Sequence, residues 1–384
     1  MLAEAFADKG YMVHCFVFVE SEQNDFASFT KHNNITEYRY YPNQKIYTRF
    51  FVKMIRKSLH IMSLKKIPLR FFWGNILHWL NFYAVKKWFK KHGIVLDFCI
   101  GVEKGGVTCA YELWKLFGVP YFYFSLELYL ESDNCEYDPV IMALRPQERR
   151  AHAVASGVLV QDEQRGNILY ASNQVDRDKV PMCLFPISMR KPNICLQSDI
   201  IKNQKTKQLL IFGNSRMTED EFVNLSCSLP QDYMILYHNR GDSCVQSLVE
   251  KHALKQVVIS TSDLDEEEIS KLIDNARIGL CWYVETIENN RLTAFASEKL
   301  TRCLSHGIPV IANAKTNFPE LFFRYACGIA VNDVTEIPQA IQMIEENYVD
   351  YTRQALTAFD NIYNFEKNFV TVESFISASL KKSR

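Results

Sequence analysis

The stretch from Ser297 to Val331, SEKLTRCLSHGIPVIANAKTNFPELFFRYACGIAV, decides the fold class of this chain. Around its start, apolar side chains recur at helical spacing, at positions 296, 300, 303 and 304, which predicts a helix with one face in a core. Gly307 ends that helix, and the apolar run over 308–312 predicts a fully buried strand. A helix followed by a buried strand is the repeating unit of parallel α/β sheets.

The same alternation extends outward through both halves of the chain. We expect strands over 95–101, 119–124, 157–160, 180–185, 208–212, 233–237, 257–260, 278–282, 309–312 and 328–331, with helices between them. The polar residues 186–206 lose this periodicity and are predicted to be a linker. We therefore predict an α/β protein with two doubly wound domains, 1–190 and 207–346, facing a cleft at the carboxyl ends of their strands. Helices over 347–384 are expected to pack back across both domains.

The first domain departs from this scheme at its start. Residues 2–9 predict an amphipathic helix that Gly10 ends, and a strand over 12–19 follows. The opening strand of a doubly wound sheet is central, and here a helix stands in its place. We therefore expect the first strand of the N-terminal domain to be missing.

Composition excludes several classes of protein. The 384 residues include 44 Lys and Arg against 44 Asp and Glu, with 48% hydrophobic and 23% charged residues. These values exclude a disordered chain and a globally basic nucleic-acid binder. The 11 cysteines form no CxxC pair and no Cys/His cluster at metal spacing, which indicates reduced thiols in a cytosolic protein. No signal peptide and no apolar run long enough to span a membrane is recognised.

The zero net charge hides a strongly basic interval. Between Glu37 and Asp97 the chain has 13 Lys and Arg and no acidic residue, interleaved with Phe, Trp and Tyr. Basic and aromatic residues at helical spacing favour an anionic membrane surface, so helices over 45–92 are predicted to bind one. Two alternatives remain open: amphipathic helices with solvated lysines, and nucleic acid, which would give a steep salt dependence. Our prediction is membrane contact and no nucleic acid.

Four short motifs in the C-terminal half occur in a characteristic order: Lys299, Gly307-Ile-Pro-Val-Ile311, Pro319-Glu320 and Gly328-Ile-Ala-Val331. Together they resemble the nucleotide-sugar-binding half of GT-B glycosyltransferases of the retaining, glycosyltransferase 4-like group. The stretches LLIFGNS, EEEISKLIDNARIGLCWY and LAEAFADKGYMVHCFVF fit further parts of that architecture. The resemblance implies two Rossmann-like domains and covers most of the chain. Arg302 stands where the family has a ribose-binding Glu, and Glu298 is a candidate substitute.

Departure of a nucleotide diphosphate needs positive charge or backbone N–H donors aimed at the developing charge. Lys299, in the first turn of its helix, is the principal candidate, both as a catalytic and as a donor-binding residue. The resemblance adds a donor contact from the loop that carries Glu320. The donor-binding candidates are Gly213, Asn214, Arg216, Arg291, Glu298, Lys299 and Glu320. The alternatives are solvated surface residues and, for Glu298 and Arg302, an ion pair across one helical turn.

Candidates on the acceptor side follow the strands of the first domain. Glu127, after the strand over 119–124, is a candidate catalytic or sugar-contacting residue, and Glu103 and Lys104 are candidate acceptor-binding residues. The resemblance implies that no protein nucleophile is needed, because a donor phosphate oxygen can take the acceptor's proton. No DxD motif stands at a strand end, so neither a metal nor any other cofactor is predicted.

These observations predict a hexosyltransferase-type enzyme that moves a sugar from a nucleotide sugar to a lipid-linked or surface-polysaccharide acceptor. It would be cytoplasmic, with peripheral contact to the inner face of the membrane. Two alternatives use the same fold: a catalytically inactive assembly partner and a nucleotide-sugar epimerase.

Overall fold

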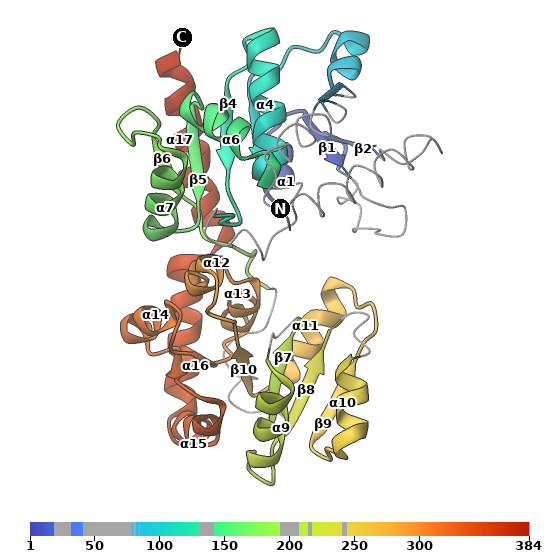
Figure 1. Ribbon diagram of the computed structural model, residues 1–384, viewed down its shortest axis with the longest axis vertical. Coiled ribbons are helices and arrows are strands. Elements are labelled where there is room, and N and C mark those ends of the chain that lie inside the picture. The colour runs from blue at the N-terminus through green and yellow to red at the C-terminus, as the bar shows by residue number, and fades with distance from the viewer. Residues whose placement is uncertain are drawn as a thin grey trace, which may run out of the picture. The chain divides into compact units, whose positions relative to one another are not determined.

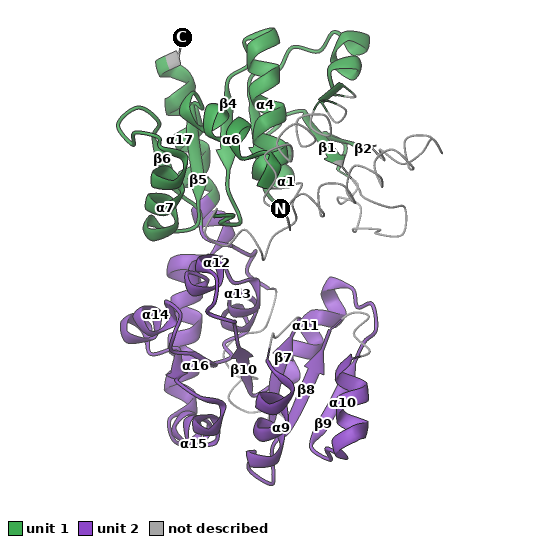
Figure 2. Ribbon diagram, viewed as in Figure 1, with its two compact units in different colours: residues 1–185, 369–384 green, residues 186–368 purple. Residues whose placement is uncertain are grey.

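The computed structural model describes residues 1–18, 32–40, 79, 82–83, 85–130, 142–192, 207–213, 217–239 and 244–383. The chain divides into two compact units (Figure 2). Unit 1 comprises residues 1–185 and 369–384, and unit 2 comprises residues 186–368. The expected linker over 186–206 lies partly outside the described residues.

Unit 1 alternates short strands with helices (Figure 1). Its elements are α1 (Leu2–Asp8), β1 (Val13–Phe18), β2 (Ile35–Tyr40), β3 (Cys99–Val102), α4 (Glu103–Phe117), β4 (Tyr121–Phe124), α6 (Arg145–Ala153), β5 (Gly157–Val160), α7 (Glu163–Asn173) and β6 (Met182–Leu184). The strands form a parallel pair β1-β2 and a parallel four-stranded sheet in the order β3-β4-β5-β6.

The described strands of unit 1 thus fall into two separate sheets. Among the described residues of unit 1, β1 pairs with β2 alone and β3 with β4 alone. A doubly wound sheet of the usual order places its opening strand between the strands that correspond to β1 and β3.

Unit 2 contains one six-stranded parallel sheet. Its elements are β7 (Gln208–Phe212), α9 (Glu219–Ser228), β8 (Met234–His238), α10 (Cys244–His252), β9 (Val257–Ser260), α11 (Glu266–Asn275), β10 (Ile278–Cys281), α12 (Glu288–Arg291), a 3₁₀ turn (Ala294–Ala296), α13 (Glu298–Ser305), β11 (Val310–Asn313), α14 (Phe318–Tyr325), β12 (Gly328–Val331), a 3₁₀ turn (Val334–Glu336), α15 (Ile337–Glu346), α16 (Tyr348–Ala358) and a π-turn (Phe359–Tyr363). The last helix, α17 (Phe365–Ser383), begins in unit 2 and ends in unit 1.

The strand order of unit 2 is β12-β11-β10-β7-β8-β9, which is the doubly wound arrangement. Successive residues of β7 point to opposite faces: Leu210 lies in one buried apolar cluster, and Leu209 and Ile211 lie in the other. Helices therefore cover both faces, as a parallel sheet requires. The order reverses between β7 and β10, and ligands of such sheets bind beyond the carboxyl ends of the strands at this reversal. The predicted α/β doubly wound class is confirmed.

Only the end of the predicted basic-aromatic interval 45–92 lies within the described residues. Residues 85–92 are helical, and Phe82, Val85 and Phe89 pack in one buried cluster with Cys109 and Leu113 of α4. In the part of the chain that the structure describes, no helix is both long enough and apolar enough to cross a membrane.

Candidate functional site

The carboxyl edge of the unit 2 sheet brings Gly213 and Lys299 together. Gly213 follows β7 with a φ of +68°, and its N–H donates a hydrogen bond of 2.7 Å to the carbonyl of His238. A Cβ built on Gly213 would lie 3.4 Å from Cε of Lys299. Only glycine adopts this left-handed conformation without strain, so the backbone turns here and stays open beside the lysine stem.

Lys299 is held over an ordered aromatic ring. Its Nζ lies 5.0 Å from the ring centroid of Tyr283, the second residue after β10. The Tyr283 hydroxyl is 2.7 Å from Oγ of Ser297, which in turn accepts the Leu300 N–H and so caps α13. Asn313, the last residue of β11, donates to the Tyr283 carbonyl at 2.6 Å. Lys299 therefore stands in the first turn of a capped helix at the strand-order reversal, where the helix dipole favours an anion.

Arg302 forms a charged network with two carboxylates. Its side chain is only 9% exposed, and its guanidinium lies 2.8 Å from Glu298 and 2.9 and 3.0 Å from the two oxygens of Glu266. Burial opposes the positive charge, but the two carboxylates outweigh it and raise the pKa of Arg302. The same hydrogen bonds lower the pKa of Glu266. Glu298 is thus placed in an ion pair across one helical turn, and Arg302 ties α13 to α11.

Arg291 ends the short helix α12, Glu320 lies in the first turn of α14, and Asn317 joins these two segments. The Asn317 side chain accepts the Ala294 N–H at 2.8 Å, and its own N–H donates to the Arg291 carbonyl at 2.8 Å. Arg291 and Glu320 are both exposed, and each pairs within its own helix, with Glu288 and Arg324 respectively. Asn214 and Arg216 lie outside the described residues. The structure thus brings Gly213 and Lys299 together and leaves Arg291 and Glu320 at the surface.

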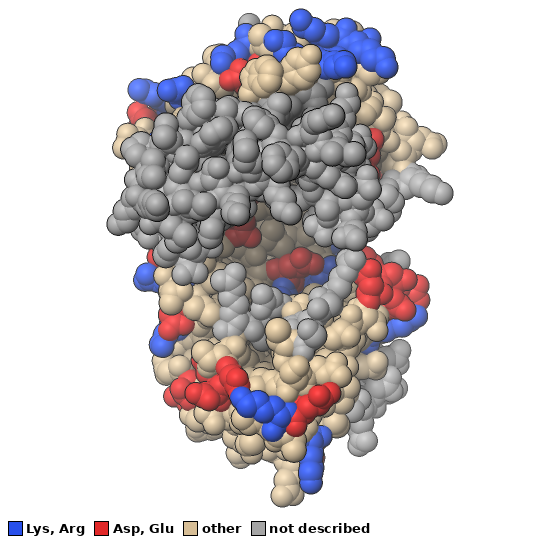
Figure 3. Space-filling model, turned by 45° about the vertical axis from the view of Figure 1, so that its right-hand side comes forward, with Lys and Arg blue, Asp and Glu red and all other residues tan. Residues whose placement is uncertain are grey.

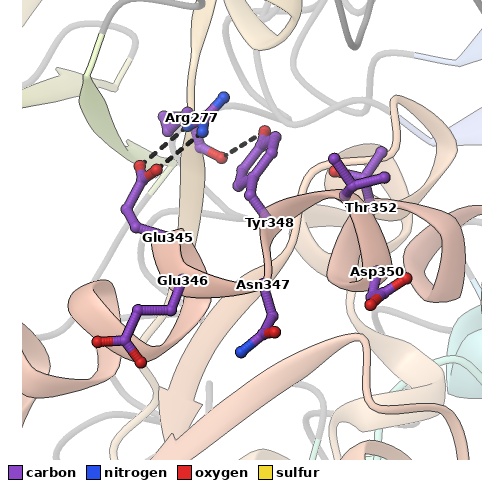
Figure 4. A pocket seen from close by; sticks show the side chains of 8 residues that line it. Arg277, Glu345, Glu346, Asn347, Tyr348, Asp350 and Thr352 are labelled. Atoms are coloured by element: carbon purple, nitrogen blue, oxygen red, sulfur yellow. Dashed lines mark hydrogen bonds and ion pairs between the residues drawn. The ribbon is translucent and has the colours of Figure 1, made fainter.

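A cavity of about 380 Å³ lies elsewhere in unit 2 (Figure 4). Arg277 lines it and directly precedes β10, so this residue stands at the amino end of the strand, opposite Lys299. The guanidinium donates to both oxygens of Glu345, at 2.9 and 2.8 Å, and lies 3.3 Å from the ring centroid of Tyr348. Because its charge is neutralised in place, Arg277 is a poor candidate for holding a diphosphate.

At the carboxyl edge of the four-stranded sheet of unit 1, Glu103 and Glu127 come together. Glu103 begins α4, and its Oε1 accepts the backbone N–H groups of Leu126 at 2.6 Å and Glu127 at 2.9 Å. Burial raises the pKa of Glu103 to about 7, and those two N–H donors only partly offset it. The Glu127 side chain is exposed.

Lys104 lies beneath this edge, in a buried charged group. It is 2% exposed, with Nζ 3.0 Å from the Tyr129 carbonyl and 3.3 Å from Glu148. Glu148 also accepts from Arg145 at 2.9 Å and from the Tyr123 hydroxyl at 2.8 Å. Burial lowers the pKa of Lys104 to about 8, whereas its cationic neighbours overcome the effect of burial on Glu148 and lower that pKa. Lys104 therefore supports the edge from below and is not presented on it.

Sequence reasoning missed Tyr283 and Asn313 at the unit 2 edge, and Gln161 and Arg165, which donate hydrogen bonds to the carbonyls of Ser125 and Leu126 at the unit 1 edge. Tyr283 and Asn313 could have been found, because each stands at or just after a predicted strand end. No group of three His, Cys, Asp or Glu side chains in the described ranges is arranged to hold a metal ion. The prediction that no cofactor is used stays a prediction.

Comparisons with known proteins bear on both the domain and the fold. Residues 204–365 match the family model described as glucosyltransferase 3-like, C-terminal domain. No curated protein matches the sequence significantly.

Three solved structures illustrate the similarity of fold. Sucrose-phosphate synthase from Thermosynechococcus elongatus is 14% identical, with a TM-score of 0.70 over 100% of this chain and 92% of that one. WaaG, a glycosyltransferase involved in lipopolysaccharide biosynthesis, is 14% identical, with a TM-score of 0.60 over 94% and 90%. Anabaena Alr3699/HepE in complex with UDP-glucose is 11% identical, with a TM-score of 0.56 over 78% and 82%. The chain therefore has the GT-B fold, and its residues 204–365 are similar to the C-terminal domain of glucosyltransferase 3-like proteins.

Proposed function

We propose that this chain is a glycosyltransferase that takes a sugar from a nucleotide-sugar donor at the carboxyl edge of unit 2. The observation that carries this proposal is the position of Lys299, in the first turn of α13 and beside the open Gly213 turn. An ammonium and a helix N-terminus together would stabilise the negative charge that develops on a departing diphosphate. Two of the similar structures are described as complexes with UDP and UDP-glucose, so a uridine nucleotide is the first donor to test.

Thermal-shift measurements with UDP and UDP-glucose test the donor site. A ligand that binds only the folded protein raises the midpoint of unfolding by mass action. Lys299→Met should weaken nucleotide binding by roughly tenfold or more, because charge-assisted phosphate contacts are among the stronger polar contacts. Lys271→Met, which removes an exposed lysine of α11 paired with Glu267, is the matched control. Equal shifts for wild type and Lys299→Met would contradict the proposed role of Lys299.

We further propose that the acceptor is lipid-linked or a surface polysaccharide, and that unit 1 contacts an anionic membrane. The helix over 85–92 exposes Lys87, Lys90 and Lys91, and Figure 3 draws Lys and Arg side chains gathered at the upper end of unit 1. Phe89 of that helix lies 6.0 Å, ring to ring, from Phe117, which ends α4.

Exposed apolar side chains accompany these lysines. They are Trp79, Tyr83, Trp114, Leu116 and Phe117, each between 38% and 59% exposed. Lysines attract anionic headgroups, and aromatic side chains insert at the interface, so this combination supports membrane contact.

Flotation with vesicles tests the membrane contact. Wild type should float with vesicles that contain phosphatidylglycerol and remain behind with pure phosphatidylcholine. Reversing Lys87, Lys90 and Lys91 to Glu should abolish flotation, whereas reversing Lys381 and Lys382, an exposed pair at the end of α17, should not. Equal flotation of both variants would contradict the assignment of this surface.

Product analysis separates transfer from its alternatives. With UDP-glucose, a retaining hexosyltransferase releases UDP and keeps the α configuration of the transferred sugar, which proton NMR measures. Conversion of the free nucleotide sugar without release of UDP would identify an epimerase. Binding without turnover, with the candidate acceptors supplied on membranes, would favour an inactive assembly partner.

A further inference from the structure

Glu103 stands in a strained turn between β3 and α4. Its φ of +57° is in the left-handed region, which strains a residue that has a Cβ. A Cβ on Gly101 would lie 2.5 Å from Cα of Val107, and one on Gly106 would lie 3.1 Å from the Gly101 carbonyl carbon. Strand and helix therefore touch through two glycines, and the chain reverses sharply at Glu103. Strained strand-to-helix turns of this kind present one side chain above the edge of a parallel sheet.

The Glu103 side chain joins two elements that are separated in sequence. Its Oε1 accepts the N–H groups of Leu126 and Glu127, which follow β4. Its Oε2 is buried, and no described residue donates a hydrogen bond to it. One oxygen of the carboxyl group is thus occupied by hydrogen bonds from the backbone of the loop over 125–130.

Three further buried side chains hold the same loop. Gln161, just after β5, donates to the Ser125 carbonyl at 2.7 Å, and Arg165 of α7 donates to the Leu126 carbonyl at 2.6 Å. Lys104 donates to the Tyr129 carbonyl at 3.0 Å. Gln161 and Arg165 are 1% exposed and Lys104 is 2% exposed, so these contacts are shielded from water. Glu103 is the member of this group that fixes the N–H of Glu127 itself.

We propose that Glu103 is a positioning residue that holds the 125–130 loop so that the Glu127 side chain is presented at the carboxyl edge of unit 1. The inference rests on the proposed function, in which this edge takes the acceptor. It replaces the expectation that Glu103 binds the acceptor directly, because the backbone of the loop already occupies Oε1. Glu127 is then the residue of the pair that meets the sugar hydroxyls.

Hydrogen exchange of the 125–130 segment, followed by mass spectrometry at about pH 8, tests the positioning role. Glu103→Ala should speed exchange of the Leu126 and Glu127 amides about tenfold, because it removes a charge-assisted acceptor from both. Glu103→Gln keeps one oxygen acceptor and should restore most of the protection. Glu103→Gly removes the side chain and relieves the strained φ, so fast exchange in it assigns the effect to the carboxyl group.

The matched control is Glu112→Ala, which removes a carboxyl group of the same helix that pairs with Lys115. This control should leave the loop protected. Unchanged exchange of 125–130 in a folded Glu103→Ala protein would overturn the proposal, as would a rise spread evenly over unit 1. If Glu103→Ala does not fold, Glu103→Gln serves alone. It should then speed loop exchange about threefold, and no change would overturn the proposal.

Kinetics distinguish failure of this inference from failure of the proposed function. For UDP-glucose turnover, Glu103→Ala should lower kcat about tenfold or more and leave the UDP-induced thermal shift unchanged, since Lys299 is in unit 2. Glu103→Gln should recover most of kcat. If wild type neither binds nor turns over UDP-glucose, the proposed donor fails, and the exchange experiment still decides whether Glu103 holds the loop. A loss of kcat without faster hydrogen exchange in the 125–130 loop would contradict a positioning role for Glu103.

Discussion

Two buried groups of unit 1 should give opposite pH dependences to its stability. Burial lowers the pKa of His152 from 6.5 to about 4 and raises that of Glu103 from 4.5 to about 7. Between about pH 4.5 and 6.5 the unfolded chain binds a proton at His152 that the folded chain does not, so this group favours folding more as pH rises. In the same window the folded chain holds a proton at Glu103 that the unfolded chain has lost, so this group favours folding less as pH rises.

The two contributions are similar in size. Each shift spans about 2.5 pH units, which corresponds to at most about 3 kcal/mol. Wild type should therefore have a nearly flat profile of unfolding free energy over this window. His152→Phe removes the His152 contribution, so only that of Glu103 remains. The free energy of unfolding should then fall by up to about 3 kcal/mol as pH rises from about 4.5 to 7. Glu103→Gln should do the reverse and lose stability as pH falls below about 6.5.

Urea denaturation at closely spaced pH values measures these slopes, with tryptophan fluorescence as the signal. Lys104, with a pKa of about 8, titrates above the window. Other titrating groups contribute equally to wild type and both variants and cancel in the comparison. Parallel profiles for the three proteins would refute the reasoning, because they would mean that neither group changes its pKa on folding.

Three further substitutions test the packing of the two edges, each by urea denaturation. Gly101→Ala should destabilise unit 1 by about 2–4 kcal/mol, because the new Cβ meets backbone atoms of α4, whereas at Gly105 a Cβ meets nothing within 4 Å and Ala should be tolerated. Glu148→Gln should cost roughly 3 kcal/mol, since it leaves Lys104 and Arg145 buried with less opposing charge, and a loss below about 1 kcal/mol would contradict this. Arg302→Met should cost only about 1 kcal/mol, because its partners Glu266 and Glu298 are largely exposed and the methionine stem keeps the packing.

The sequence predicted the sheets closely because apolar runs bounded by turn residues report burial directly. The predicted strands 157–160, 208–212, 257–260 and 328–331 have the bounds that the structure gives them. Where the ends of the other predicted strands differ, they do so by one to four residues, as for the strand expected over 95–101, which begins at Cys99. The strand β2 was not predicted. Burial patterns do not mark where pairing with a neighbouring strand begins, which explains the difference.

The candidate site was less predictable, because a side chain's partners lie far away in the sequence. Lys299 was found from a motif, but its position over Tyr283 depends on Asn313, from another strand. Lys104 follows a strand end as an exposed ligand would, yet Glu148, 44 positions later, accounts for its burial. Spacing along the chain gives the edge on which a residue stands, and only the packed structure gives the neighbours that neutralise it.

The two carboxyl edges are built in physically different ways, and this difference bears on their roles. At the unit 2 edge, Lys299 is partly exposed. The Tyr283 ring that it contacts is held in place by hydrogen bonds to two neutral side chains, Ser297 and Asn313. An anion at this edge would meet the Lys299 ammonium in the first turn of α13, beside the Gly213 turn. At the unit 1 edge, cations and carboxylates are buried and paired beneath the loop, and the Glu127 side chain reaches the surface. A site that binds a diphosphate needs a cation at its surface, whereas one that orients sugar hydroxyls needs a rigid hydrogen-bond acceptor. The electrostatics therefore favour the donor on unit 2 and the acceptor on unit 1.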